Sequence, residues 1–259
     1  MGITDTIILL SVGLISGSLN AVAGGGTFIA FPALVWIGLL PIKANATATF
    51  ALWPGTLTTI FAFRKELVKN KDKLPLFLSL SIFGGLIGAE ILLHISNNRF
   101  ASIVPYLLFA ATMLFTFRNH LIKWVSATSV SYGSGYSSPF FRIVIIFLFI
   151  AISIYGGFFG AGMGILLLGL FSLMGMQNLY EMSALRSCSG LFANIIAIIL
   201  FGAYGIILWP QAIIMAIGAS IGGYGAAHFS LRLPQTWSRN AVVVIAWVMT
   251  LYFFCKQWI

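Results

Sequence analysis

Three consecutive glycines stand in the run Asn20-Ala-Val-Ala-Gly24-Gly25-Gly26-Thr27, near the middle of a long uncharged stretch. Glycine interrupts helices, and the peptide N–H groups freed there, with the positive end of a following helix, attract anions. Asn20 and Thr27 add neutral donors. We therefore expect this run to bind an anion. The alternative is a glycine cluster that only packs helices together.

A second glycine-rich run extends from Tyr155 to Gly164, with apolar flanks. We expect it to offer backbone donors, at Gly160, Gly162 and Gly164. A polar helix start follows each run: Asn45, Thr47 and Thr49 after the first, and Ser183, Arg186, Ser187 and Ser189, with Asn194 deeper, after the second. The two polar faces are expected to meet at one substrate-binding cavity.

Arg186 is the only basic residue that we place inside an apolar span. Such a charge is costly in a membrane unless it faces a cavity or a partner, and its planar fork suits an oxyanion. Two other interpretations stay open: Arg186 reaches the headgroups, or it pairs with Glu181.

Glu90 and His94 lie four residues apart, on one helical face, and are our candidates for proton coupling. An interfacial structural role is the alternative. The few His, Cys and carboxylate residues form no ligand cluster, so we expect no metal and no cofactor. Ser220 and His228 stand too far apart on one expected helix to share a hydrogen bond, so we expect no catalytic residues and no enzyme.

The composition indicates an all-α integral membrane protein, with 60% apolar residues, 7% charged residues and a mean hydropathy of +1.03. The basic residues occupy short gaps between apolar runs, so the net charge of +9 reflects membrane topology. We expect a multi-pass protein of the cell (inner) membrane. Its partners would be a small anionic solute and the lipid bilayer, with no nucleic acid, and a homodimer is left open.

Six apolar segments have the length of one membrane crossing: 44–63, 74–93, 101–117, 182–201, 210–231 and 240–255. Residues 6–42 and 143–180 are uncharged stretches of 37 and 38 residues, nearly twice that length. Since both contain glycines near their middle, we interpret each as two short helices folded back as a hairpin. One long, bent helix is the alternative.

The two long segments also indicate an internal repeat with a period of about half the chain. Gly38 corresponds to Gly175, Phe63 to Phe201, and Pro75 to Pro210. The helix after each proline carries a G-x-x-x-G face, Gly84/Gly88 and Gly218/Gly222, which lets helices pack closely. The expected domains are a first repeat at 1–117, a cytoplasmic linker at 118–142 and a second repeat at 143–259.

The hairpin interpretation also gives the stronger charge asymmetry. It places ten Lys and Arg residues on one side of the membrane and three on the other, with the loops 64–73 and 118–142 in the cytoplasm. Each half then crosses an odd number of times. We therefore expect two inverted repeats, each a glycine-broken hairpin plus three transmembrane helices, about eight spans in all, with both termini outside.

Four motifs stand out in order along the chain: Asn20-Ala-Val-Ala-Gly-Gly-Gly, Phe31-Pro-Ala-Leu, Ala44-Asn-Ala-Thr and Tyr155-Gly-Gly-Phe-Phe-Gly-Ala-Gly. In this combination they resemble the sulfite exporter TauE/SafE family of membrane permeases. The resemblance covers nearly the whole chain and implies a carrier of sulfite, sulfonates or related anions. Relatives of the most similar branch have Thr-Asn-Lys where this chain has Thr47-Ala48-Thr49, and Thr-Lys where it has Arg186-Ser187.

The residues and the resemblance together predict a secondary transporter that moves small oxyanions across the membrane, as an exporter. An anion channel and a carrier of another small organic anion are the alternatives. A flux assay distinguishes these classes, because saturable uptake and counterflow are expected of a carrier and not of a channel.

Overall fold

The computed structural model describes residues 2–131, 139–229 and 235–257, and this part of the chain is all-helical. The helices are α1 (Ile3–Ala23), α2 (Thr27–Trp36), α3 (Pro41–Ala62), α4 (Arg64–Lys69), α5 (Leu74–His94), α6 (Asn97–Ser131), α7 (Pro139–Phe158), α8 (Met163–Leu173), α9 (Leu179–Ala203), α10 (Trp209–Phe229) and α11 (Gln235–Gln257).

Both long uncharged segments are broken at their glycines, as predicted. Gly24 ends α1 in the left-handed region, with φ 75°, and its N–H donates to the carbonyl of Asn20 at 3.0 Å. Gly160 and Gly162, both with φ 78°, separate α7 from α8. Residues with a Cβ rarely adopt this conformation, so glycine is what permits both breaks.

The six expected single crossings fall on α3, α5, α6, α9, α10 and α11. One boundary differs, because α6 continues to Ser131 and α7 begins at Pro139. Much of the expected linker 118–142 is therefore helical. Charged residues after Phe117 end the apolar character of the segment, but they do not end the backbone hydrogen bonding of a helix.

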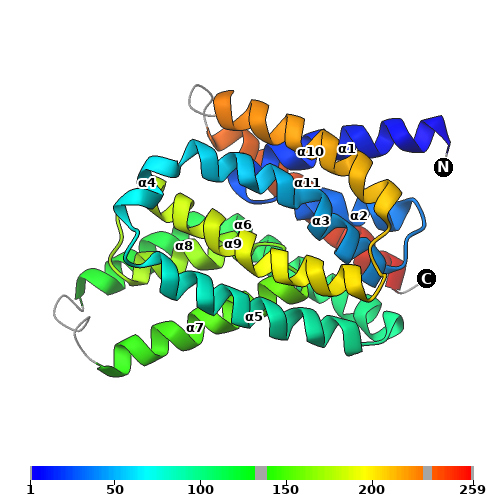
Figure 1. Ribbon diagram of the computed structural model, residues 1–259. Coiled ribbons are helices and arrows are strands. Elements are labelled where there is room, and N and C mark those ends of the chain that lie inside the picture. The colour runs from blue at the N-terminus through cyan, green and yellow to red at the C-terminus, as the bar shows by residue number, and fades with distance from the viewer. Residues whose placement is uncertain (1, 132–138, 230–234, 258–259) are drawn as a thin grey trace.

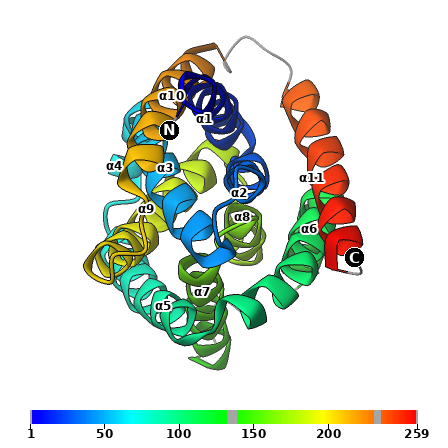
Figure 2. The same ribbon diagram turned by 90° about the vertical axis from the view of Figure 1, so that its right-hand side faces the viewer.

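Figure 1 shows both termini at one end of the molecule and α4 at the opposite end, together with the first turn of α7. In the end-on view, α2 and α8 lie near the centre, and α6 and α11 lie side by side along one flank (Figure 2). Thr112 and Thr250 join these two flanking helices through a buried hydrogen bond between their hydroxyls, at 3.0 Å.

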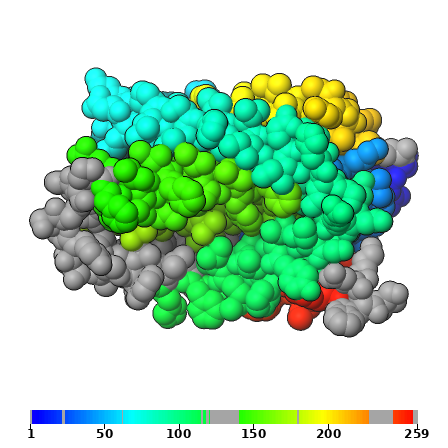
Figure 3. Space-filling view, turned by 90° about the horizontal axis from the view of Figure 1, so that it is seen from below, coloured from blue at the N-terminus to red at the C-terminus, as the bar shows by residue number. Residues whose placement is uncertain are grey.

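Four helices in the described ranges are long and apolar enough to cross a membrane: Ile3–Ala21, Leu74–His94, Phe140–Phe158 and Tyr180–Ala203. The helices α5, α6 and α7 form the outer face in Figure 3 and expose large apolar side chains such as Phe83, Phe109 and Phe147. Exposed apolar surface on this scale fits a lipid environment.

Glycines draw two pairs of helices together. A Cβ on Gly88 of α5 would overlap the carbonyl oxygen of Ile154 in α7, and one on Gly222 of α10 would overlap that of Leu14 in α1. These contacts confirm that the two G-x-x-x-G faces pack closely. We call the α5–α7 and α1–α10 contacts the two glycine seams.

Candidate functional site

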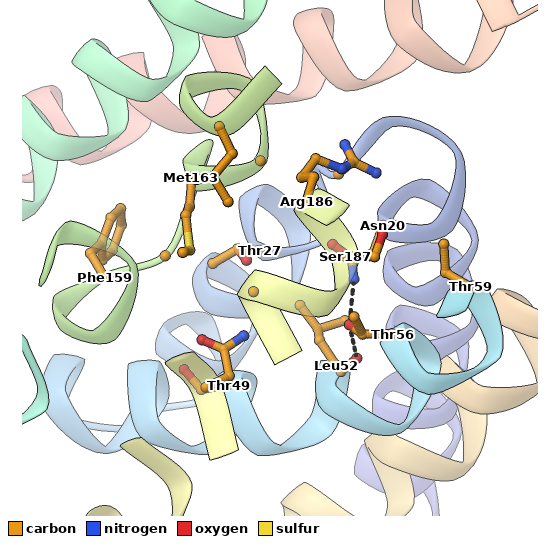
Figure 4. A pocket seen from close by; sticks show the side chains of 16 residues that line it. Asn20, Thr27, Thr49, Leu52, Thr56, Thr59, Phe159, Met163, Arg186 and Ser187 are labelled. Atoms are coloured by element: carbon orange, nitrogen blue, oxygen red, sulfur yellow. Dashed lines mark hydrogen bonds between the residues drawn. The ribbon is translucent and has the colours of Figure 1, made fainter. Parts of the chain in front are cut away.

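A cavity of about 90 Å³ lies between the two helix breaks, with room for a small solute or a few waters (Figure 4). Its wall comes from α1, α2, α3, the α7–α8 connection, α8 and α9, and both halves of the chain contribute. The lining residues are Asn20, Gly24, Thr27, Thr49, Leu52, Thr56, Thr59, Phe159, Gly160, Met163, Gly164, Leu167, Arg186, Ser187, Gly190 and Asn194.

Arg186 is the one ionisable side chain in this wall, all of which lies in the described part of the chain. The residue is only 7% exposed, although it stands two turns from the start of α9. This placement favours the cavity-facing interpretation over a side chain that reaches the headgroups. A buried guanidinium gives the cavity a fixed source of positive charge.

Two glycines, one from each break, make room for Arg186. A Cβ on Gly24 would lie 2.8 Å from Nη1 of Arg186, and a Cβ on Gly164 would lie 2.9 Å from its Cδ. Both distances are shorter than real Cβ contacts allow. The two glycine positions therefore fix the path of the arginine between the two halves.

Neutral polar groups accompany the arginine. The amide of Asn20 donates to the hydroxyl of Thr56 at 3.3 Å, and Thr56 donates to the carbonyl of Leu52 at 3.2 Å. Figure 4 draws Asn20 and Ser187 with Arg186 on one side of the view, and Phe159 and Met163 on the other. The cavity thus has a polar, cationic part and an apolar part.

The faces of α3 and α9 toward the cavity follow the same spacing. Thr49 and Ser187, Leu52 and Gly190, and Thr56 and Asn194 are three pairs of lining residues, each 138 positions apart in the chain. Each face also has helical periodicity, with positions 49, 52 and 56 on α3 and 187, 190 and 194 on α9. The same stretch of each half therefore meets the cavity.

The structure brings most of the predicted binding residues to the cavity wall: Asn20, Gly24, Thr27, Thr49, Gly160, Gly164, Arg186, Ser187 and Asn194. It places Gly25, Gly26, Asn45, Thr47 and Gly162 outside that wall. Gly26 packs against α1, where a Cβ would lie 2.5 Å from the carbonyl oxygen of Ser16, and Gly162 packs toward Ala111 of α6.

Asn45 and Thr47 form hydrogen bonds with backbone groups at the ends of other helices. The amide of Asn45 donates to the carbonyl of Phe158, the last residue of α7, at 3.0 Å. The hydroxyl of Thr47 accepts from the N–H of Leu208, just before α10, at 3.2 Å. Helix ends leave backbone groups without intrahelical partners, and buried side chains such as these two satisfy them.

The carboxylate candidates lie outside the cavity wall. Glu181 is in the first turn of α9 and accepts from the amide of Asn178 at 3.3 Å. A hydrogen bond to Glu66, with a smaller effect from Glu181, raises the pKa of Lys69 on α4. Glu90 and His94 form an exposed pair at the end of α5, with Oε2 and Nδ1 3.4 Å apart.

Sequence reasoning missed several lining residues, namely Leu52, Thr56 and Thr59 on α3, with Phe159, Met163 and Leu167 at the second break. The spacing of the α3 residues from Thr49, at three, seven and ten positions, was the available signal. The apolar residues at the second break give no such signal, because they look like ordinary core.

Comparison with known proteins gives a family match. The model of the family described as Sulfite exporter TauE/SafE matches residues 9–253. No solved structure matches the chain significantly.

Curated relatives are similar over nearly the full length. A protein of Haemophilus influenzae named "Probable membrane transporter protein" is 28% identical over 253 residues, covering 96% of this chain and 94% of its own. "Probable membrane transporter protein YfcA" of Escherichia coli is 25% identical, covering 94% and 87%. "Probable membrane transporter protein ORF9" of a Sinorhizobium species is 25% identical, covering 92% and 88%.

Proposed function

Since this chain belongs to the sulfite exporter TauE/SafE family and is a multi-pass membrane transporter, we propose that it is a secondary carrier of small oxyanions. Sulfite and sulfonates are the leading substrates, and export is the proposed direction. The protein acts as a permease and catalyses no covalent reaction.

The observation that carries this proposal is the buried Arg186 in the wall of the cavity between the two breaks. A guanidinium offers up to five N–H donors in a plane and recognises the oxygens of an oxyanion in pairs. Ser187 and Asn194 on the same helix supply neutral donors. Together these residues form a compact anion site in a low-dielectric environment.

Two helix starts support the same proposal. The helices α2 and α8 begin at the breaks, where Gly24 and Thr27, and Gly160 and Met163, line the cavity. The N-terminus of a helix carries a partial positive charge and free N–H groups. Broken helices whose N-termini point at an anionic group are a recurring arrangement in secondary transporters.

We further propose that the halves, 1–117 and 143–259 on either side of a cytoplasmic linker, are inverted repeats, each a glycine-broken hairpin plus three transmembrane helices, about eight spans in all. The pairs α1–α2 and α7–α8, α3 and α9, α5 and α10, and α6 and α11 correspond in order. Their contacts are reciprocal: α5 packs on α7 and α10 on α1, while α6 packs on α8 and α11 on α2. In Figure 1 the first half begins at the end that holds both termini, whereas α7, the first helix of the second half, begins at the opposite end, and this reversal supports an inverted arrangement.

Transport would then proceed by alternating exposure of the cavity as one half moves against the other. The sequence has no nucleotide-binding motif, so an ion gradient or the gradient of the substrate supplies the energy. Glu90 and His94 stay our candidates for carrying a coupled proton.

Flux through proteoliposomes tests the carrier proposal. Purified protein should take up radiolabelled sulfite with saturation, and unlabelled sulfite inside the vesicles should accelerate that uptake by counterflow. A channel would give flux without counterflow. Absence of any sulfite, sulfonate or organic-anion flux above empty vesicles would refute the oxyanion function.

Topology fusions test the inverted repeats. Alkaline phosphatase fused after Ile259 should be active, and a fluorescent protein fused there should stay dark, because the C-terminus is proposed to face outside. The same reporters inserted at Asn70, beyond α4, should give the opposite result. A fluorescent C-terminal fusion would contradict the inverted arrangement.

A further inference from the structure

We infer that the cavity selects monovalent oxyanions and rejects divalent ones of the same size. This inference rests on the proposed function and names the charge class of its substrate. Hydrogensulfite and sulfonates belong to the accepted class, whereas sulfite in its dianionic form and sulfate belong to the rejected class.

The argument begins with the charge of the wall. Of the lining residues, only Arg186 is ionisable, so the wall supplies at most one full positive charge. A monoanion is balanced by that charge. A dianion leaves at least one negative charge without a full countercharge, which is costly in a buried site.

The other lining groups do not replace a second countercharge. Asn20, Thr56 and Asn194 are neutral, and Phe159 and Met163 offer no donor. The starts of α2 and α8 add partial positive charge, but a helix end contributes less free energy than burial of an uncompensated charge costs. Hydrogen bonds and helix dipoles therefore orient the bound anion, whereas the single charge of Arg186 determines that the cavity accepts an anion with one negative charge.

The size of the cavity strengthens this selection. A volume of about 90 Å³ corresponds to about three waters at roughly 30 Å³ each, so an oxyanion that fills the cavity keeps only part of its hydration shell. The bound anion must exchange water for protein groups, and a dianion loses far more hydration free energy than a monoanion does.

Three probes of similar size separate charge from shape and polarity. Methanesulfonate is an apolar-tipped monoanion, sulfamate is a polar-tipped monoanion, and sulfate is a dianion. Thermal shifts of the purified protein should show binding of both monoanions and roughly hundredfold weaker binding of sulfate. Binding of sulfate as tight as that of sulfamate would overturn the inference.

The protonation of sulfite gives an independent test. Hydrogensulfite loses its proton near neutral pH, so sulfite uptake into proteoliposomes should fall as pH rises through that value. Methanesulfonate stays monovalent throughout and reports any titration of the protein itself. On the helices around the cavity, the described titratable or charged residues besides Arg186 are Asp5, Lys43, Arg142, Tyr155, Tyr180, Glu181 and Cys188.

The expected result is therefore a fall in sulfite uptake relative to methanesulfonate uptake as pH rises. Parallel pH profiles for the two anions, with sulfate transported as well, would overturn charge selection while leaving the transporter proposal intact. Failure of every oxyanion to bind or move would overturn the proposed function and this inference together.

A second positive charge should relax the selection. Thr49 lines the cavity on α3, so Thr49→Lys adds one charge, and Thr49→Gln is a neutral control that also lengthens the side chain. We expect tenfold or more tighter sulfate binding for the lysine variant, at roughly one decade per 1.4 kcal/mol, and no gain for the glutamine variant. Equal sulfate binding by the two variants would contradict the charge argument. The wild-type probe series decides the inference even where a variant folds poorly.

Discussion

The two halves of the molecule build the cavity with similar backbones and different chemistry. Each contributes a glycine break with a left-handed residue, and each presents a helix face at matching positions. At the 138-residue spacing, however, Ala48 of α3 stands where α9 has Arg186. Ala48 is fully buried and carries no polar group, so the only charge in the wall belongs to the second half.

This difference separates the residues that shape the backbone around the cavity from the one side chain that gives the cavity its charge. The breaks, the seams and the matched faces depend on small residues, which permit close approach and unusual backbone angles. The charge depends on one side chain. Substitutions in the scaffold should therefore act on stability in both halves, whereas loss of the anion site should follow from changes around Arg186 alone.

The largest expected effect follows removal of the charge. Arg186→Gln should reduce anion transport by about a hundredfold or more, because a charged hydrogen-bonding group contributes roughly 1.5–3 kcal/mol per bond and several bonds are lost. Arg186→Lys should keep a weakened activity, since the charge stays while the two-pronged geometry is lost. Proteoliposome uptake of sulfite and methanesulfonate measures both variants.

Glu181→Gln provides the control for this experiment. If Glu181 were the main partner of Arg186, Arg186→Gln would fold poorly, because loss of one member of a buried ion pair leaves the other charge uncompensated. The double variant Arg186→Gln/Glu181→Gln would then restore expression. Near wild-type transport by Arg186→Gln would end the assignment of this residue to the substrate.

The next largest effect is expected at the two glycine seams, where equivalent substitutions in the two halves should lower stability by similar amounts. Gly88→Ala and Gly222→Ala each place a Cβ against a backbone carbonyl of the facing helix. We expect each to lower the free energy of unfolding by about 1–3 kcal/mol, as overpacking does. Thermal unfolding in detergent measures this effect. A large loss of stability for the variant at one seam and no loss for the variant at the other would show that the two halves do not pack in the same way.

A smaller effect distinguishes two helical glycines in the cavity wall. A Cβ on Gly164 meets Arg186, whereas one on Gly190 meets nothing within 4 Å. Gly164→Ala should therefore displace the arginine and weaken transport about tenfold, a loss of roughly 1.4 kcal/mol. Gly190→Ala should leave Arg186 in place and therefore weaken transport less than Gly164→Ala does, and it should gain up to about 1 kcal/mol of stability from its better helix propensity. Equal uptake by the two variants would contradict the role of Gly164 in fixing the path of Arg186.

The smallest effect is expected far from the cavity, at the exposed end of α5. Glu90→Gln should change uptake without a pH gradient by less than about twofold, because exposed ion pairs contribute little. Proton coupling through Glu90 and His94 predicts that the same variant loses stimulation by an imposed pH gradient. Unchanged stimulation would leave the pair with a structural role.

The sequence was a good guide wherever a physical signal was local. Charged residues delimited the spans, and glycines near the middle of overlong stretches marked both breaks. Charge was a weaker guide to helix ends, since α6 continues to Ser131 beyond the end of its apolar span. Polar character alone did not separate Asn45 and Thr47 from the residues that line the cavity, because a buried amide or hydroxyl can bond to the backbone at a helix end as readily as to a ligand.

The wall of the cavity was harder to predict because it depends on the rotation of each helix about its axis. Thr49 and Thr56 share one face of α3, but nothing local identifies that face as the one toward the cavity. Met163 and Leu167 were missed for a different reason, since apolar residues beside a substrate and apolar residues in a core have the same composition.

The α1–α10 seam also bears on biosynthesis. The face of α1 that carries Gly13 and Gly17 is covered by Met215 and Ala219 of α10, and Ser18 donates to the carbonyl of Gly222 at 3.1 Å. When α1 leaves the ribosome, this partner has not yet been translated. The helix α1 must therefore stay in the bilayer without its contact to α10 until α10 has been translated and inserted. A polypeptide that ends before Trp209 lacks α10, so the glycine face of α1 that α10 covers in the complete fold stays without this partner.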